Sequence, residues 1–118
     1  MTAEELAVLI RSTRLRFGTE SDLQDDLEKM LTAAGVVFIR ECRLTKRHTI
    51  DFWIEGGIGV ECKVDGSVSE IAPQLMNYAE SPKVETLLLV TSRARHRFQT
   101  NELRGKPFGV VWVGASSL

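Results

Sequence analysis

The sequence predicts a single α/β (α+β) domain in which helices flank a mixed β-sheet. Three observations lead to this prediction. Apolar residues recur at helical spacing before residue 35, an alternating pattern surrounds the glycines at 56–57, and residues 84–91 form a continuous apolar run. With 118 residues, of which 43% are hydrophobic and 26% charged, the chain can bury a core and should fold.

Two helices are expected first, at 3–14 and 20–34. Residues 12–18 between them form a basic connector. Thr19 is suited to cap the second helix, and Gly35 to end it. The apolar stripe of the second helix consists of Leu23, Leu27, Met30, Leu31 and Ala34.

The rest of the chain alternates between strands and helices. The expected elements are a strand at 36–41, a basic loop at 43–48, a hairpin at 50–64, a helix at 70–80 starting near Ser69 with Pro73 in its first turn, a buried strand at 84–91, a helix at 92–103 capped by Ser92, and a strand at 108–113. The predicted order is α-α-β-β-β-α-β-α-β. It divides into an N-terminal helix and connector (1–18), a core (19–91) and a C-terminal helix and strand (92–118).

The hairpin carries the most informative residues. A three-residue turn at 55–57 pairs Ile54 with Ile58 and Phe52 with Val60, and it puts Asp51 opposite Glu61. A two-residue turn would instead push Asp51 into the core, because a slip of one residue reverses every side chain.

In the three-residue register the hairpin has one polar and one apolar face. The polar face carries Asp51, Trp53, Glu61 and Lys63, and the apolar face carries Ile50, Phe52, Ile54, Ile58, Val60, Cys62 and Val64. Facing carboxylates repel unless a cation lies between them, and such oxygen ligands suit Mg²⁺ or Mn²⁺. The alternative is a half-solvated hairpin with scattered charges. Trp53 either stacks on a base or packs under a helix, and packing is the more common role.

These residues resemble the PD-(D/E)xK phosphodiesterase superfamily, whose restriction-endonuclease-like fold has the core order α-β-β-β-α-β. Asp51 and the run Glu61-Cys62-Lys63 match its motif in identity and order, although Ile50 stands where the name has Pro. Gln74 and Tyr78 resemble the Gln-x-x-x-Tyr motif of RecB-like nucleases. Glu20 resembles the first-helix Glu of small resolvase-like members, and Arg40-Glu41 is similar to the corresponding stretch of virus-type replication-repair nucleases.

The resemblance implies a metal-dependent nuclease that hydrolyses DNA phosphodiester bonds, of structure-specific or resolvase-like type. It implies that Asp51, Glu61, the Cys62 backbone carbonyl and Glu20 hold Mg²⁺ or Mn²⁺. Lys63 would then act on the attacking water or the phosphate, and Gln74 and Tyr78 would position neighbouring groups. Glu20 is equally well explained as a first-turn acid favoured by the helix dipole.

Two other classes of function are compatible with the same fold. The chain could be a non-catalytic or partner-dependent nucleic-acid-binding protein, or an interaction protein without a nucleic-acid role. The intact Asp51, Glu61 and Lys63 favour the enzyme.

The net charge of −1 does not by itself indicate a polyanionic partner. Basic residues instead gather in connectors, and the resemblance makes branched or double-stranded DNA the expected partner. The predicted nucleic-acid contacts are Arg43, Lys46, Arg47, Arg93, Arg95 and Arg97. His48 and His96 are expected to be polar surface groups, because neither has a second His at ligand spacing.

The two cysteines lie in predicted strands, which indicates buried thiols in a reducing compartment. With no signal peptide or membrane span visible, we expect a cytoplasmic protein without membrane contact. The apolar strand at 108–113 suggests a homodimer interface anchored by Trp112. Internal packing of this strand against the N-terminal helix is the competing expectation.

Overall fold

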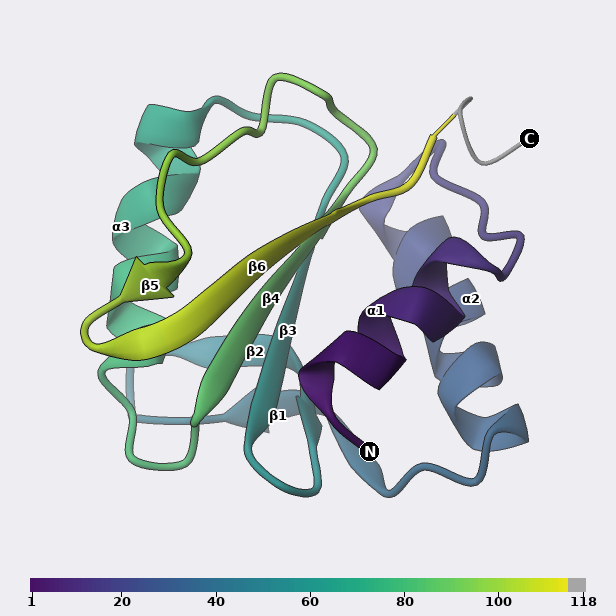
Figure 1. Cartoon of the computed structure of the whole chain (residues 1–118), viewed down its shortest axis with the longest axis horizontal. Helices are drawn as coiled ribbons and strands as arrows, with labels where there is room; N and C mark the ends of the chain where they lie inside the picture. The colour runs from purple at the N-terminus through teal and green to yellow at the C-terminus, as the bar shows by residue number, and fades with distance from the viewer. Residues whose placement is uncertain (115–118) are drawn as a thin grey trace.

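The computed structural model describes residues 1–114, and its six-stranded mixed sheet lies between helices on both faces (Figure 1). The elements are α1 (Ala3–Arg11), α2 (Glu20–Ala33), β1 (Phe38–Arg43), β2 (Thr49–Ile54), β3 (Ile58–Lys63), α3 (Val68–Ala79), β4 (Thr86–Thr91), β5 (Glu102–Leu103) and β6 (Lys106–Trp112). The predicted α+β class is confirmed, and α2-β1-β2-β3-α3-β4 reproduces the predicted core order.

The strand order β1-β2-β3-β4-β6-β5 divides the sheet into two kinds of pairing. Strands β3, β4 and β6 run parallel to one another, whereas β1–β2, β2–β3 and β5–β6 are antiparallel. A parallel neighbour needs a crossover connection, and α3 supplies it between β3 and β4. The carboxyl ends of β3, β4 and β6 therefore lie at the same edge of the sheet.

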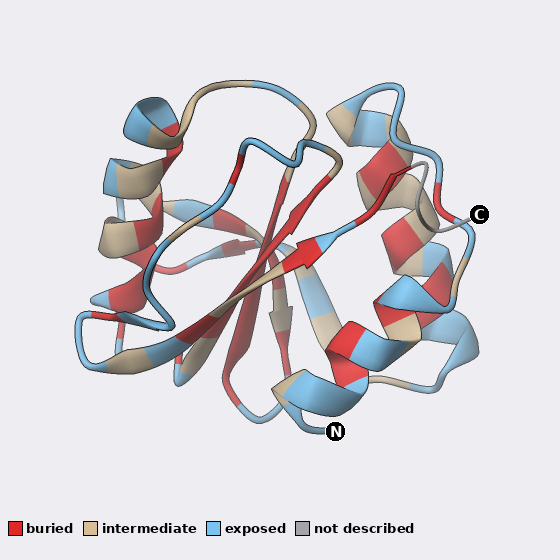
Figure 2. Cartoon of the chain, turned by 45° about the horizontal axis from the view of Figure 1, so that its top comes forward, coloured by how far each residue is buried: buried red, intermediate tan, exposed pale blue. Residues whose placement is uncertain are grey.

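Each face of the sheet is covered by different helices. Helices α1 and α2 pack on one face and α3 on the other, with buried residues on both faces of the central strands (Figures 1 and 2). Val111 and Val113 share a core cluster with Leu6 and Ile10 of α1. The expectation that the C-terminal strand packs against the N-terminal helix is therefore confirmed.

The helix boundaries follow their caps. Thr19 caps α2 as predicted, and its hydroxyl accepts a hydrogen bond from the Asp22 N–H at 3.0 Å. Helix α1 ends at Arg11 rather than at residue 14. Helix α3 starts earlier than predicted, because Ser67 rather than Ser69 is its N-cap. Pro73 consequently lies beyond the first turn, where a proline removes one backbone hydrogen bond.

The predicted fourth helix at 92–103 is wrong. Residues 92–101 form an irregular loop that leads into the short strand β5. His96 is 1% exposed, and its ring contacts the Thr91 hydroxyl and the Gly66 carbonyl, each at 2.6 Å. The expectation that His96 is a surface group is also wrong, because these contacts hold its ring against the sheet.

The hairpin register is confirmed, with Phe52 paired to Val60 and Ile54 to Ile58. Ile50, however, packs in the cluster under α3, whereas Phe52 packs under α1 and α2. The prediction that Ile50 and Phe52 lie on the same face of the hairpin is therefore wrong. The alternation is interrupted at the level of Asp51, opposite Glu41, whose φ of 53° lies in the left-handed region.

Trp53 takes the packing role. Its ring lies against the cluster under α3, and its N–H donates to the Lys83 carbonyl at 2.7 Å. Both cysteines are free and buried, as predicted. No helix within residues 1–114 combines the length and apolar character needed to span a membrane.

Candidate active site

The candidate site lies where β2 and β3 part. Backbone pairing between these strands runs from Ile54–Ile58 to Phe52–Val60. Beyond this point, carboxylates bridge the strands. The Cys62 N–H donates to Asp51 Oδ2 at 2.8 Å, and the Asp51 N–H donates to Glu61 Oε1 at 3.2 Å. The divergence of the hairpin thus makes room for two acidic side chains within the sheet.

Glu61 is 2% exposed and reaches the third helix. Its Oε2 lies 3.3 Å from the Tyr78 hydroxyl, which also lies 2.9 Å from the Thr49 carbonyl and accepts a bond from Gln74 Nε2 at 2.8 Å. Because a phenol has one proton to donate, the Thr49 carbonyl and an ionised Glu61 compete for it. When Glu61 is protonated, it can donate to Tyr78 instead and every group is satisfied.

Lys63 completes the group of residues predicted to be catalytic. Residues 61 and 63 share a face of β3, and Lys63 Nζ lies 3.5 Å from Glu61 Oε2. The Lys63 side chain is only 19% exposed. The structure therefore brings together Asp51, Glu61, Lys63, Gln74 and Tyr78, which the sequence distributes over two strands and a helix.

The electrostatics of the pair are unfavourable for two negative charges. Burial, followed by the charge of Asp51, raises the pKa of Glu61 to about 8, and the positive charge of Lys63 only partly opposes this shift. Burial also raises the pKa of Asp51, against the hydrogen bond from Cys62. At neutral pH the two carboxyl groups therefore hold a proton between them. A bound divalent cation would replace this proton and neutralise the charge of both carboxylates.

The residues fit a divalent oxygen-ligated ion in part. Asp51 and Glu61 supply two carboxylates, and Mg²⁺ commonly keeps several waters beside one or two such ligands. Within residues 1–114, no group of three His, Cys, Asp or Glu side chains is arranged to hold a metal ion. Glu20, at the start of α2, is close enough to contribute to the raised pKa of the buried Cys62 thiol, after burial, Asp51 and Glu61. It is not part of a three-residue metal group.

Gln24 is the α2 residue that the sequence interpretation missed. Burial raises the pKa of Asp51, and the Gln24 side chain is a minor contribution against this shift; its Oε1 also accepts a bond from Arg40 at 3.2 Å. The helical spacing could have predicted its position, because Gln24 follows Glu20 by about one turn and lies on the same face of α2.

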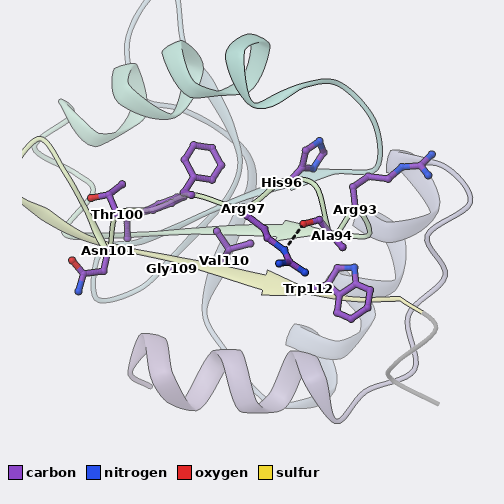
Figure 3. Close-up of a pocket in the computed structure, with 11 residues that line it drawn as sticks. Arg93, Ala94, His96, Arg97, Thr100, Asn101, Gly109, Val110 and Trp112 are labelled. Atoms are coloured by element: carbon purple, nitrogen blue, oxygen red, sulfur yellow. Dashed lines mark hydrogen bonds between the residues drawn. The ribbon is translucent and has the colours of Figure 1, made fainter.

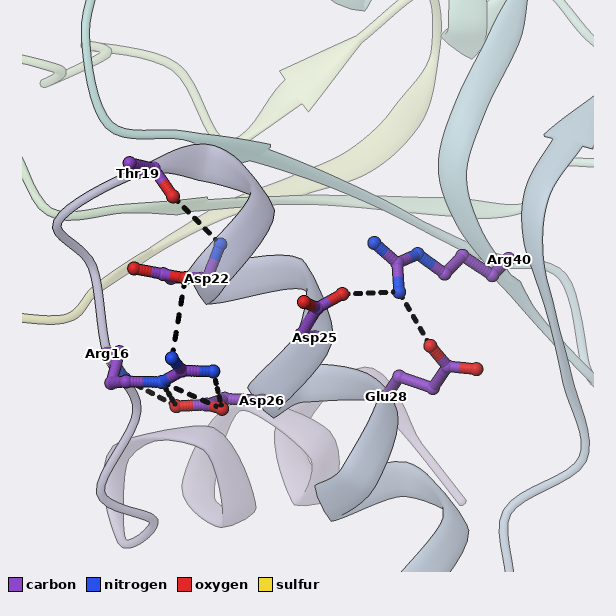
Figure 4. Close-up of polar contacts among 7 residues, drawn as sticks. All are labelled: Arg16, Thr19, Asp22, Asp25, Asp26, Glu28 and Arg40. Carbon is purple, nitrogen blue, oxygen red and sulfur yellow. Dashed lines mark hydrogen bonds and ion pairs between the residues drawn. The ribbon is translucent and has the colours of Figure 1, made fainter.

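Two basic residues near α2 are neutralised by its acids (Figure 4). Arg16 pairs with Asp26 at 3.0 Å and Asp22 at 3.4 Å. Arg40 pairs with Glu28 at 2.6 Å and with Asp25 at 2.9 Å. Both guanidinium groups are consequently poor candidates for binding phosphate.

The residues predicted to contact nucleic acid lie in two places, at the β1–β2 turn and in the loop after β4. Arg43, Lys46, Arg47, Arg93, Arg95 and Arg97 are all exposed. Of these, Arg95 is paired with Asp65 at 3.0 Å. Two bonds tie this loop to β3, which carries the site. The Ser92 N–H donates to the Lys63 carbonyl at 3.4 Å, and the Arg93 Nε donates to the Val64 carbonyl just beyond β3 at 2.7 Å.

Comparisons of the chain with protein-family models, curated proteins and solved structures give no match.

Proposed function

We propose that this chain is a Mg²⁺- or Mn²⁺-dependent nuclease that hydrolyses DNA phosphodiester bonds, and that it is a member of the PD-(D/E)xK superfamily. The observation that carries the proposal is the buried Asp51–Glu61 pair with Lys63 beside it. Burying two facing carboxylates lowers the stability of a fold, and groups with such raised pKa values occur preferentially at functional sites. Within the proposal, a branched or double-stranded DNA is the substrate and the cytoplasm the compartment.

The residues of the site have separate tasks. Asp51 and Glu61, with the Cys62 carbonyl, would hold the ion, which acidifies water and stabilises the charge that develops on phosphate. Lys63 would orient the attacking water or contact the phosphate. Tyr78 fixes the Glu61 carboxylate, and Gln74 fixes the Tyr78 hydroxyl, so these two residues position the site.

A second candidate is a nucleic-acid-binding protein on the same fold that is non-catalytic or depends on a partner for catalysis. The observation favouring it is that, in residues 1–114, the carboxylate pair gains no third His, Cys, Asp or Glu that would complete a metal group. This candidate predicts DNA binding that persists when Asp51 is replaced, with no cleavage by the wild type.

The test is cleavage of linear, nicked, flap and four-way-junction DNA with Mg²⁺ or Mn²⁺, with EDTA as a control. Asp51→Asn, Glu61→Gln and Lys63→Met should each lower the cleavage rate about a hundredfold or more. Glu55→Gln is the matched control, because Glu55 is an exposed carboxylate in the turn of the same hairpin. Cleavage in EDTA, or wild-type cleavage by Glu61→Gln, would reject the assigned site.

A homodimer is part of the proposal for cutting two strands, because one site cuts one strand and two-fold dimers are common. Strand β5 pairs with β6 at Lys106 and Pro107, and Trp112 at the other end of β6 is 41% exposed. Sedimentation velocity at micromolar concentration tests the interface. A monomeric wild type would reject the dimer. A Trp112→Ala variant that remains dimeric would show that the interface does not include Trp112.

A further inference from the structure

A cavity of about 480 Å³ lies between the loop at 92–101 and strand β6 (Figure 3). Its volume falls in the range of about 300–1,000 Å³ that is usual for small-ligand sites. Phe98, Phe108 and Val110 contribute apolar surface, and the two phenylalanine rings meet edge to face with centroids 5.1 Å apart. Neither Asp51 nor Glu61 lines this cavity, so it is distinct from the carboxylate pair.

Trp112 stands at one end of the cavity in a fixed orientation. Its indole N–H donates to the Ser92 carbonyl at 3.1 Å. The ring also lies against Gly114, where an added Cβ would come within 3.2 Å of the indole atoms. The side chain nevertheless remains 41% exposed. An aromatic ring held on two sides and still accessible is suited to stacking, because little further ordering is required when a ligand binds.

Positive charge surrounds the same cavity. The Nε groups of Arg93 and Arg97 donate to the carbonyls of Val64 and Ala94, at 2.7 and 2.9 Å. Among residues 1–114, neither guanidinium has a carboxylate within ion-pair distance, whereas Arg95 is paired with Asp65. A hydrogen bond from Gly66 and then the charges of Arg93 and Arg95 lower the pKa of Asp65. Arg93 therefore interacts with the negative charge of Asp65, and the charge of Arg97 is less compensated than that of Arg93. In Figure 3, Arg97 extends from the loop toward β6 and Trp112.

Lys63, beside the carboxylate pair, and Trp112, at the cavity, lie on the same face of the sheet near its carboxyl edge. Lys63, Thr91 and Trp112 are in register across β3, β4 and β6. Two strand spacings of about 4.8 Å separate the backbones of Lys63 and Trp112 by about 10 Å. One strand of nucleic acid could therefore contact both places.

We propose that this cavity binds one unpaired nucleotide of the strand held at the Asp51–Glu61 site. The base stacks on Trp112, which this assignment gives to nucleic acid in place of a dimer interface, and Arg97 contacts its phosphate. A base inside a duplex has both faces covered by its neighbours, whereas an unpaired base offers a free face to an aromatic ring. The inference rests on the proposed function and adds its substrate class, which is DNA with a single-stranded end, flap or gap.

The experiment compares binding of two fluorescein-labelled DNAs in EDTA, a blunt duplex and the same duplex with a short thymidine overhang. The wild type should prefer the overhang. Trp112→Ala removes the stacking ring and should weaken overhang binding about tenfold or more. Arg97→Gln removes one positive charge and should weaken it about several-fold. Binding of the blunt duplex should change little in either variant. Arg104→Gln is the matched control, because Arg104 pairs with Glu80 at 3.2 Å and does not line the cavity.

Tryptophan fluorescence separates stacking from general attraction. The chain has two tryptophans, and Trp53 is tied to Lys83 away from the cavity lining. The overhang DNA should quench the wild-type emission. Trp112→Phe should keep the binding, since a phenyl ring also stacks, but lose the quenching. Arg97 is exposed, so Arg97→Gln keeps the test valid if Trp112→Ala fails to fold.

Three outcomes would decide the matter. Overhang binding that is unchanged in both variants would overturn the inference. Equal quenching by thymidine monophosphate and by the overhang, at equal nucleotide concentration, would also overturn it and indicate a free-nucleotide site. Overhang binding that depends on Trp112, without cleavage by the wild type under any metal, would keep the inference and reject the proposed nuclease.

Discussion

Asp51 and Glu61 hold a proton between them at neutral pH. Burial, and then the Asp51 charge, raises the pKa of Glu61 to about 8, and the Asp51 N–H lies 3.2 Å from Glu61 Oε1. An unfolded chain would release this proton near the ordinary value of 4.5. The folded state therefore binds more protons than the unfolded state between about pH 4.5 and 8.

The first prediction is that stability falls as pH rises through this window. Proton binding by the folded state makes the free energy of unfolding decrease with pH. The melting temperature should be highest near pH 5 and lower by about 5 °C or more at pH 8.5. Glu61→Gln mimics the protonated acid, so its melting temperature should be flatter across this range. A wild-type curve that rises from pH 5 to 8 would contradict the pKa assigned to Glu61.

The second prediction concerns metal binding in the absence of DNA. At pH 8, Mg²⁺ or Mn²⁺ should raise the melting temperature of the wild type, because an ion that binds only the folded state stabilises it. Asp51→Asn and Glu61→Gln should lose most of this rise, and Glu55→Gln should retain it. An equal rise in all four proteins would indicate that the ion binds elsewhere.

The third prediction concerns the Tyr78 hydroxyl. Tyr78→Phe removes the partner of the Gln74 amide and of the Thr49 carbonyl. The free energy of unfolding, measured by urea denaturation, should fall by about 1–3 kcal/mol. Combining Tyr78→Phe with Gln74→Leu should cost less than the sum of the two changes, because they share a hydrogen bond. Additive losses would show that the two side chains act independently.

The fourth prediction tests the packing beneath the site. A Cβ at Gly59 would lie 2.8 Å from Ile50 Cδ1 and 3.3 Å from Leu87 Cδ1. Gly59→Ala should therefore destabilise the fold by about 1–3 kcal/mol through overpacking. Gly18→Ala is the control, since its nearest neighbour would be Asp22 Oδ2 at 3.9 Å. Equal melting temperatures for the two variants would contradict the position of Ile50.

The fifth prediction concerns the anchor of the loop at 92–101. Nε2 of His96 must carry a proton, because it faces the Gly66 carbonyl, and Nδ1 shares a hydrogen bond of 2.6 Å with the Thr91 hydroxyl. His96→Ala removes both contacts and should make the loop accessible to trypsin, which cleaves after Arg93, Arg95 and Arg97. Native-state digestion should be at least several-fold faster than for the wild type. His48→Ala, outside this loop, should leave the rate unchanged.

The sequence was sufficient where local pattern and structure agree. Alternating apolar residues and the turn at 55–57 determine the hairpin register, and so the proximity of Asp51 and Glu61. The four-residue spacing of Gln74 and Tyr78 places their side chains in contact along α3. Each of these predictions depends on residues that are close in sequence or joined by a short turn.

Prediction failed where distant contacts determine the structure. His96 is held by Gly66, thirty positions earlier, and this contact excludes the helix expected after Ser92. Ile50 changes face where Glu41, on the neighbouring strand, adopts a left-handed backbone. Neither interaction leaves a periodic signal, because each joins segments that are separated in the chain.

The packing of α1 against β6 has a consequence for synthesis of the chain. During synthesis, α1 cannot complete its packing until Val111 and Val113 have been added to the chain, because these residues share its core cluster. Strand β4, in the centre of the sheet, likewise gains its second neighbour only when β6 arrives. A nascent chain that lacks β6 exposes both the edge of β4 and the apolar side of α1, and it should recruit chaperones until β6 has been synthesised.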